Sequence, residues 1–215
     1  MTNYDEALEA ARNGKLPSDF NQWSLANNDR WTIAHAAAAM GILPDDFNLW
    51  LLADIYGWTV AHVAAMNGFL PKAFKYWDSA DNDGKTVAHF AAATGNLPAD
   101  FDQWALADFS GWTVAHAAAK AVVLPKHFTQ WALADIDGWS VAHEAACSGA
   151  LPKGFKHWRL ADNNGDTVAH IAALYGTLPD NFQFWSMTNK TGETVEDCYL
   201  KRLFELKKRS HIHDN

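Results

Sequence analysis

The sequence predicts an all-α fold, a helical solenoid of stacked helix-turn-helix repeats. Two observations predict it. The dipeptide Leu-Pro occurs seven times at a constant step of 27 residues, beginning at Leu16 and ending at Leu178. A phenylalanine and a tryptophan follow each Leu-Pro at fixed distances, as Phe20 and Trp23 do in the first copy. A single short unit cannot bury its apolar face, whereas units stacked in one dimension bury it against their neighbours.

The first helix of each repeat is predicted from its caps. In the copy that spans Asp108 to Asp135, Thr113 is suited to the N-cap, and the run from Val114 to Lys120 is compatible with a helix. Alanines within this run allow neighbouring helices to approach closely. Most copies place a glycine after the run, as the C′ position of a helix prefers, but here the position holds Val122.

Leu-Pro predicts the start of a second helix in each repeat. Proline is favoured in the first turn of a helix, where its missing N–H costs nothing. Phe128 and Trp131 would lie three residues apart on the apolar side of this helix. Each repeat is therefore expected to be a short helix-turn-helix.

The repeats predict a single domain over residues 1–215. Residues 1–27 lack the helix motif of the other copies and fit an N-terminal cap repeat. Six 27-residue repeats follow over residues 28–189, and residues 190–215 fit a C-terminal cap helix and tail. Polar outer caps are what a finite solenoid needs to stay soluble.

The repeat motif resembles a known family. The pattern Asp-x-x-Gly-x-Thr-x-x-His-x-Ala-Ala-x-x-Gly resembles the first half of an ankyrin repeat, and Asp54 to Gly68, DIYGWTVAHVAAMNG, fits it almost throughout. Two features differ: Val-Ala stands where the family has Pro-Leu, and the step is 27 residues instead of about 33. The resemblance implies ankyrin-like repeats in which the second helix and the projecting hairpin loop are shortened.

Six histidines recur in register and could suggest a metal ladder or a proton relay. They are His35, His62, His89, His116, His143 and His170. Helices pack about 8–10 Å apart, whereas two imidazoles that share a zinc ion need nitrogens within about 4 Å. The resemblance instead implies that each histidine hydrogen-bonds to its threonine turn and to neighbouring backbone. No metal and no cofactor are therefore expected.

The sequence does not predict an enzyme. It contains no Gly-rich phosphate loop, no Gly-x-Ser-x-Gly and no His-Glu-x-x-His. Aspartates recur before each first helix, as Asp54 and Asp81 do. Repetition favours a structural role for them, because Asp at a turn accepts backbone hydrogen bonds.

The positions that vary between repeats predict a surface that binds a protein partner. By resemblance to ankyrin repeats, the turn positions and the end of the first helix line the concave face, which is the family's usual binding surface. Tryptophans at the turns would make that face an aromatic patch of the kind that marks interaction sites. The alternative is that each tryptophan packs flat on the adjacent turn. The candidate residues are Trp31, Ile55, Tyr56, Trp58, Met66, Lys85, Phe109, Trp112, Lys120, Ile136, Trp139, Asp166 and Tyr175.

Charge favours a basic protein as the partner, for recruitment or inhibition. Residues 1–108 carry 14 acids and 6 bases, whereas residues 109–215 carry 11 of each. Nucleic acid is disfavoured because contact with phosphates needs a basic stripe. Two alternatives stay open: a self-assembling protein whose tryptophans pair between copies, giving a homo-oligomer, and an acidic mimic of DNA that acts as an inhibitor.

Composition favours a cytoplasmic protein, or one delivered into a host cell as an effector. The longest apolar stretches fall short of the ~20 residues that span a bilayer, so no membrane is expected as a partner. The first residues are acidic and polar, unlike an export signal. Only two cysteines occur, Cys147 and Cys198, without CxxC spacing, which is typical of a reducing compartment.

Overall fold

The computed structural model describes residues 3–213 and consists of short α-helices joined by long loops. Within these residues the helices are α1 (Tyr4–Arg12), α2 (Ile33–Met40), α3 (Val60–Asn67), α4 (Val87–Thr94), α5 (Val114–Lys120), α6 (Val141–Ser148), α7 (Val168–Tyr175) and α8 (Val195–His213). No helix in this part of the chain is both long enough and apolar enough to cross a membrane.

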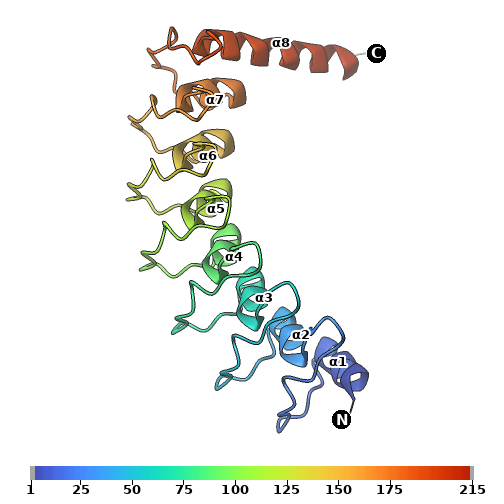
Figure 1. Ribbon diagram of the computed structural model, residues 1–215. Helices are drawn as coiled ribbons and strands as arrows, with labels where there is room; N and C mark the ends of the chain where they lie inside the picture. Colours follow the sequence, from blue (N-terminus) through green and yellow to red (C-terminus); the bar gives the residue numbers. More distant parts are fainter. Residues whose placement is uncertain (1–2, 214–215) are drawn as a thin grey trace. The chain divides into compact units, whose positions relative to one another are not determined.

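The helices form two compact units, which we call unit 1 (Met1–Phe109) and unit 2 (Ser110–Asn215). In unit 1, α1 packs on α2, α2 on α3 and α3 on α4; in unit 2, α5 packs on α6, α6 on α7 and α7 on α8 (Figure 1). Each unit is a stack in which every helix contacts its neighbours in the sequence. This order confirms the predicted helical solenoid.

The helix caps follow the predicted pattern. Thr59 is the N-cap of α3, and its hydroxyl accepts a hydrogen bond from the backbone N–H of His62, while the imidazole accepts one from the N–H of Thr59. This is a capping box in which histidine takes the place usually held by Glu or Gln. Gly68 ends the helix in the left-handed conformation, with a φ of 76°. At the end of α5 this conformation falls on Val122, which has a φ of 60°.

The predicted second helix is wrong, because each Leu-Pro segment forms two isolated turns. The N–H of Phe128 donates to the carbonyl of Pro125, and the N–H of Leu133 donates to that of Gln130, with no helical ladder between them. These two turns take up the residues between Pro125 and the next turn aspartate, Asp135, so the 27-residue step leaves no room for a second helix like α5. The shortening that the ankyrin resemblance implied thus removes the helix altogether.

An aromatic ladder replaces the packing that a second helix would supply. In unit 2, Phe128 meets Trp131 at 5.0 Å between ring centroids, and Trp131 meets Phe155 of the next repeat at 5.4 Å, both edge to face. The alternation continues through Trp158 and beyond. In unit 1 the same alternation runs from Phe20 to Trp104. Edge-to-face pairs add to the apolar burial of large rings, so the ladder is a continuous seam within each unit.

The projecting hairpin is shortened to a single bridge pair. Ala53 and Thr59 form an isolated antiparallel bridge around a tight turn in which the Asp54 carboxylate accepts the N–H groups of Tyr56 and Trp58, both at 2.9 Å. This confirms the expected structural role of the recurring aspartates. Gly57 lies close to the next turn, and a Cβ there would come within 2.7 Å of the backbone nitrogen of Asn82.

We predict that Val122→Gly stabilises the protein by about 1 kcal/mol. A β-branched residue is strained at positive φ, whereas glycine is not, and Val122 is exposed, so little apolar burial is lost. Chemical denaturation measures the change. Gly149→Val is the matched control: it places the same strain in open space after α6, where the nearest atom to a Cβ is 3.8 Å away. An unstable Val122→Gly variant would contradict the prediction.

We predict that Trp131→Ala lowers the free energy of unfolding by about 3–5 kcal/mol, as expected for a buried aromatic side chain. Trp131 is buried and contacts the ring of Phe128 in its own repeat and that of Phe155 in the next. Phe204→Ala removes an exposed ring from α8 and serves as the control. Equal losses in the two variants would show that the ladder contributes little.

Candidate functional site

The recurring histidines tie each repeat to the next. Nδ1 of His62 faces the N–H of Thr59 at 3.0 Å, while Nε2 lies 3.1 Å from the carbonyl oxygen of Lys85 in the following turn. In unit 1 the same hydrogen bond joins Nε2 of His35 to the carbonyl oxygen of Trp58. In unit 2 it joins His116, His143 and His170 to the carbonyls of Trp139, Asp166 and Glu193. The implied role as a link between turns is confirmed.

This geometry requires the neutral imidazole with its proton on Nε2. A carbonyl oxygen only accepts hydrogen bonds, so Nε2 carries the hydrogen, and Nδ1 accepts from the threonine N–H. Burial lowers the pKa of His35, His62 and His143, and the bond to the backbone carbonyl and nearby aspartates oppose this only in part. The histidines therefore serve as structural donors. The described residues contain no group of three or more His, Cys, Asp or Glu side chains that could hold a metal ion.

The turn tryptophans pack on these histidines. Trp31 stacks on His35 and Trp112 on His116, each with ring centroids 4.7 Å apart and planes tilted by 30°. The ring centroids of Trp139 and His143 are 5.1 Å apart. Trp58 also contacts Phe90 of the next helix at 4.8 Å. All four tryptophans are half-buried, so each presents only part of its surface to solvent.

The turn tips expose large apolar side chains that folding does not bury. Tyr56 is 64% exposed and Phe109 is 79% exposed in unit 1, and Ile136 is 69% exposed in unit 2. Ile55 is also exposed beside Tyr56. In unit 1 these residues lie with Trp31, Trp58 and the exposed Lys85 in the turns of one stack. In unit 2, Ile136 lies with Trp112, Trp139 and the half-buried Asp166.

Three of the sequence-predicted residues lie away from the turns. Met66, Lys120 and Tyr175 are exposed at the C-terminal ends of α3, α5 and α7. The turns lead into the opposite, N-terminal ends of these helices, about 10–12 Å away for helices of seven or eight residues. The structure therefore separates these three side chains from the turn residues of the same repeats.

Sequence reasoning missed Glu144. This residue lies in α6, is 9% exposed, and accepts a hydrogen bond from the indole Nε1–H of Trp139 at 3.1 Å. A comparison of equivalent positions between repeats could have identified Glu144 as an exception. The equivalent positions of the other five 27-residue repeats hold apolar residues, namely Ala36, Val63, Phe90, Ala117 and Ile171.

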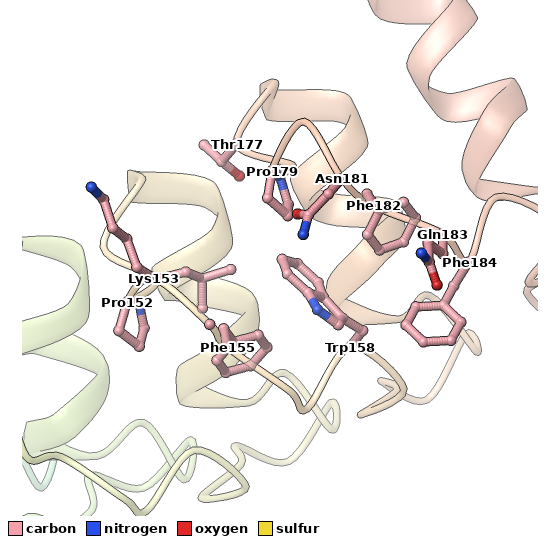
Figure 2. A pocket seen from close by; sticks show the side chains of 12 residues that line it. Pro152, Lys153, Phe155, Trp158, Thr177, Pro179, Asn181, Phe182, Gln183 and Phe184 are labelled. Carbon is pink, nitrogen blue, oxygen red and sulfur yellow. The ribbon is translucent and has the colours of Figure 1, made fainter.

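A hollow lies over the aromatic ladder of unit 2. It has a volume of about 490 Å³ and is lined by ladder rings, including Phe155, Trp158 and Phe182 (Figure 2). In Figure 2 the Lys153 side chain extends away from these rings. A comparable hollow in unit 1 is lined by Phe20 and Trp23 between its first two Leu-Pro turns. Because a comparable hollow lies between Leu-Pro turns in both units, we interpret it as a consequence of the repeat and not as a site in its own right.

Comparisons with known proteins agree with this architecture. No family model matches the sequence, and no curated protein matches it. Among solved structures, the chain is similar to the ankyrin repeat domain of Bcl-3, a member of the IkappaB protein family. The two are 20% identical, with a TM-score of 0.54, over 77% of this chain and 92% of that one. The ankyrin-like fold expected from the sequence is therefore confirmed.

We predict that the stability of the protein falls as the pH drops below about 6.5, the ordinary pKa of histidine. The pKa values of His35, His62 and His143 are lowered in the folded state, so the unfolded chain binds more protons as the pH falls. The stabilisation is complete above the unfolded pKa and is lost as the pH falls through the folded values. Urea denaturation between pH 7.5 and 5.5 measures this loss.

His143→Gln is the control for the pH effect, because glutamine can donate to the Asp166 carbonyl without titrating. The slope of stability against pH should decrease by up to about 1.4 kcal/mol per pH unit, the contribution of one proton. A flat profile for the parent protein would contradict the assigned tautomer.

Proposed function

We propose that this ankyrin-like repeat protein is a non-catalytic interaction module that binds a protein partner through the turns of its stacked repeats, for recruitment or inhibition. The tryptophan-bearing turns supply the surface, with the exposed tips as anchors. Aromatic side chains that become desolvated in a complex are frequent hot spots of protein interfaces.

The observation that carries the proposal is the exposure of apolar residues at tips where other repeats are polar. The position of Tyr56 holds Asp29 in the preceding repeat and Asp83 in the following one. The position of Phe109 holds Asn82 one repeat earlier. Since the turns form with either kind of residue, packing does not require the rings, and an exposed apolar ring calls for another explanation.

The charge of unit 1 favours a basic partner. Its first 108 residues carry 14 acids against 6 bases, a net charge of −8. A field of this sign attracts a basic surface and speeds association at low ionic strength. The partner surface is therefore expected to combine apolar side chains with lysine or arginine.

We predict that Tyr56→Asp combined with Phe109→Asn weakens partner binding by about 2 kcal/mol or more, roughly thirtyfold in Kd. Both changes install residues that neighbouring repeats already carry, so the melting temperature should stay unchanged. The wild-type chain captures the partner from its native source, mass spectrometry identifies it, and calorimetry with the purified partner gives the affinity.

Lys72→Ala is the control, because it removes an exposed side chain from a Leu-Pro turn. It should bind the partner as the wild type does. Unchanged affinity in the double variant would overturn the role of the tips. If sedimentation shows a self-associating chain that the double variant makes monomeric, the partner is a second copy of the protein.

A further inference from the structure

Unit 2 contains an open hollow that combines indole rings with carboxylates. It has a volume of about 710 Å³ and is lined by Trp112, Asp135, Asp137, Trp139, Glu144, Asp162, Asn163, Asn164 and Asp166. Five of these side chains are carboxylates and none is a lysine or an arginine. Each tryptophan has a histidine on one face, so the rest of the indole is what borders the hollow.

Turn geometry explains two of the five carboxylates. Asp135 accepts the N–H groups of Asp137 and Trp139, and Asp162 accepts those of Asn164 and Asp166, as aspartates do throughout the chain. Of the other three carboxylates, that of Asp166 accepts a hydrogen bond from the side-chain amide of Asn189 in the following turn at 2.7 Å, whereas those of Asp137 and Glu144 have no such role in a turn among the described residues. Of these, only Glu144 is deeply buried.

Glu144 is a buried carboxylate without a cation. It is more than nine-tenths buried and borders the hollow, yet its side chain accepts its hydrogen bond from a neutral group, the indole of Trp139, at Oε2. Among the described residues it takes part in no ion pair. A buried charge without a partner is costly, and helix packing does not demand one here, because five other repeats place an apolar residue at this position. The missing countercharge therefore points to a ligand.

The surroundings of Trp58 in unit 1 differ in charge from those of Trp139 in unit 2. Beside Trp58, α3 carries Val63 in the position of Glu144, and the following turn carries Lys85 in the position of Asp166. Phe90 fills the space against the Trp58 ring. Unit 2 thus has two carboxylates where unit 1 has an aliphatic side chain and a cation. The two tryptophan environments have opposite charge preferences.

We propose that the hollow at Trp139 binds the cationic side chain of an arginine or lysine from a protein partner. This rests on the proposed function and names the chemistry of one contact within it. The cation lies against indole surface, which attracts positive charge, and within reach of the carboxylates of Glu144 and Asp166. It supplies the countercharge that Glu144 lacks, and Asp137 adds to the negative field at the open side.

The test follows the indole N–H resonance of Trp139 in the full-length chain by NMR. The probe is a short capped Gly-Ser peptide with one central arginine, compared with the same peptide carrying lysine or the neutral isostere citrulline. The arginine and lysine peptides should shift this resonance saturably. Citrulline should bind about tenfold more weakly or worse, since it lacks the charge that the hollow selects. Equal binding of the arginine and citrulline peptides would overturn the proposal.

Two variants, Glu144→Val and Asp166→Lys, introduce the residues that unit 1 has at the equivalent positions. Each should weaken the arginine peptide about tenfold or more, and Glu144→Val should keep or raise the melting temperature because it removes an uncompensated buried charge. Asp83→Asn, at the position in unit 1 that matches Asp137, should leave binding unchanged. Unchanged affinity in a folded Glu144→Val or Asp166→Lys variant would overturn the proposal.

The result is separable from that of the proposed function. A partner that is lost by Tyr56→Asp with Phe109→Asn, but retained with full affinity by Glu144→Val, would refute the cation site and leave the interaction module intact.

Discussion

The histidine that bridges two successive turns is the interaction on which the stack depends. One imidazole closes the capping box of its own helix through Nδ1 and binds the next turn through Nε2, as His62 does with Thr59 and Lys85. It thereby satisfies a helix N–H that would otherwise lack a partner and fixes the distance between adjacent turns. Burial of the ring lowers the pKa of His62, so we expect protonation at acid pH to destabilise the fold. A side chain that looks catalytic in isolation is thus a structural link.

The aromatic ladder explains how so short a repeat is stable. An ankyrin-like unit normally buries its first helix against a second one, whereas here two tight turns present one phenylalanine and one tryptophan to the neighbouring repeats. In the interior of a unit each ring meets one ring of its own repeat and one of an adjacent repeat, as Trp131 does with Phe128 and Phe155. Large rings bury much apolar area for few residues, so a seam of them substitutes for helix packing. The cost of the arrangement is that every repeat depends on its neighbours.

Repetition separates packing from function in this protein. Residues that recur through the six 27-residue repeats, such as the histidines and turn aspartates, are explained by contacts that recur with them. The informative residues differ from their counterparts in other repeats: Tyr56 stands where both neighbouring repeats have Asp, Phe109 stands where the preceding repeat has Asn82, and Glu144 is charged where the other five 27-residue repeats are apolar. Tyr56 and Phe109 lie on the surface, whereas Glu144 is buried. The proposed partner, which combines apolar and cationic groups, rests on these two departures.

The sequence alone determined the repeat step, the first helices, their caps and the structural role of the histidines. These features depend on local contacts that recur, so a pattern of Thr, His and Gly at fixed spacing is enough to predict them. The sequence failed at the Leu-Pro segments, where proline predicts a helix start although the short step leaves room only for turns. Tertiary structure decided that Trp112 and Trp139 stack on histidines and that Glu144 and Asp166 border the same hollow. Which side chains of successive repeats face one another depends on how the repeats stack in space, and no spacing along the chain records it.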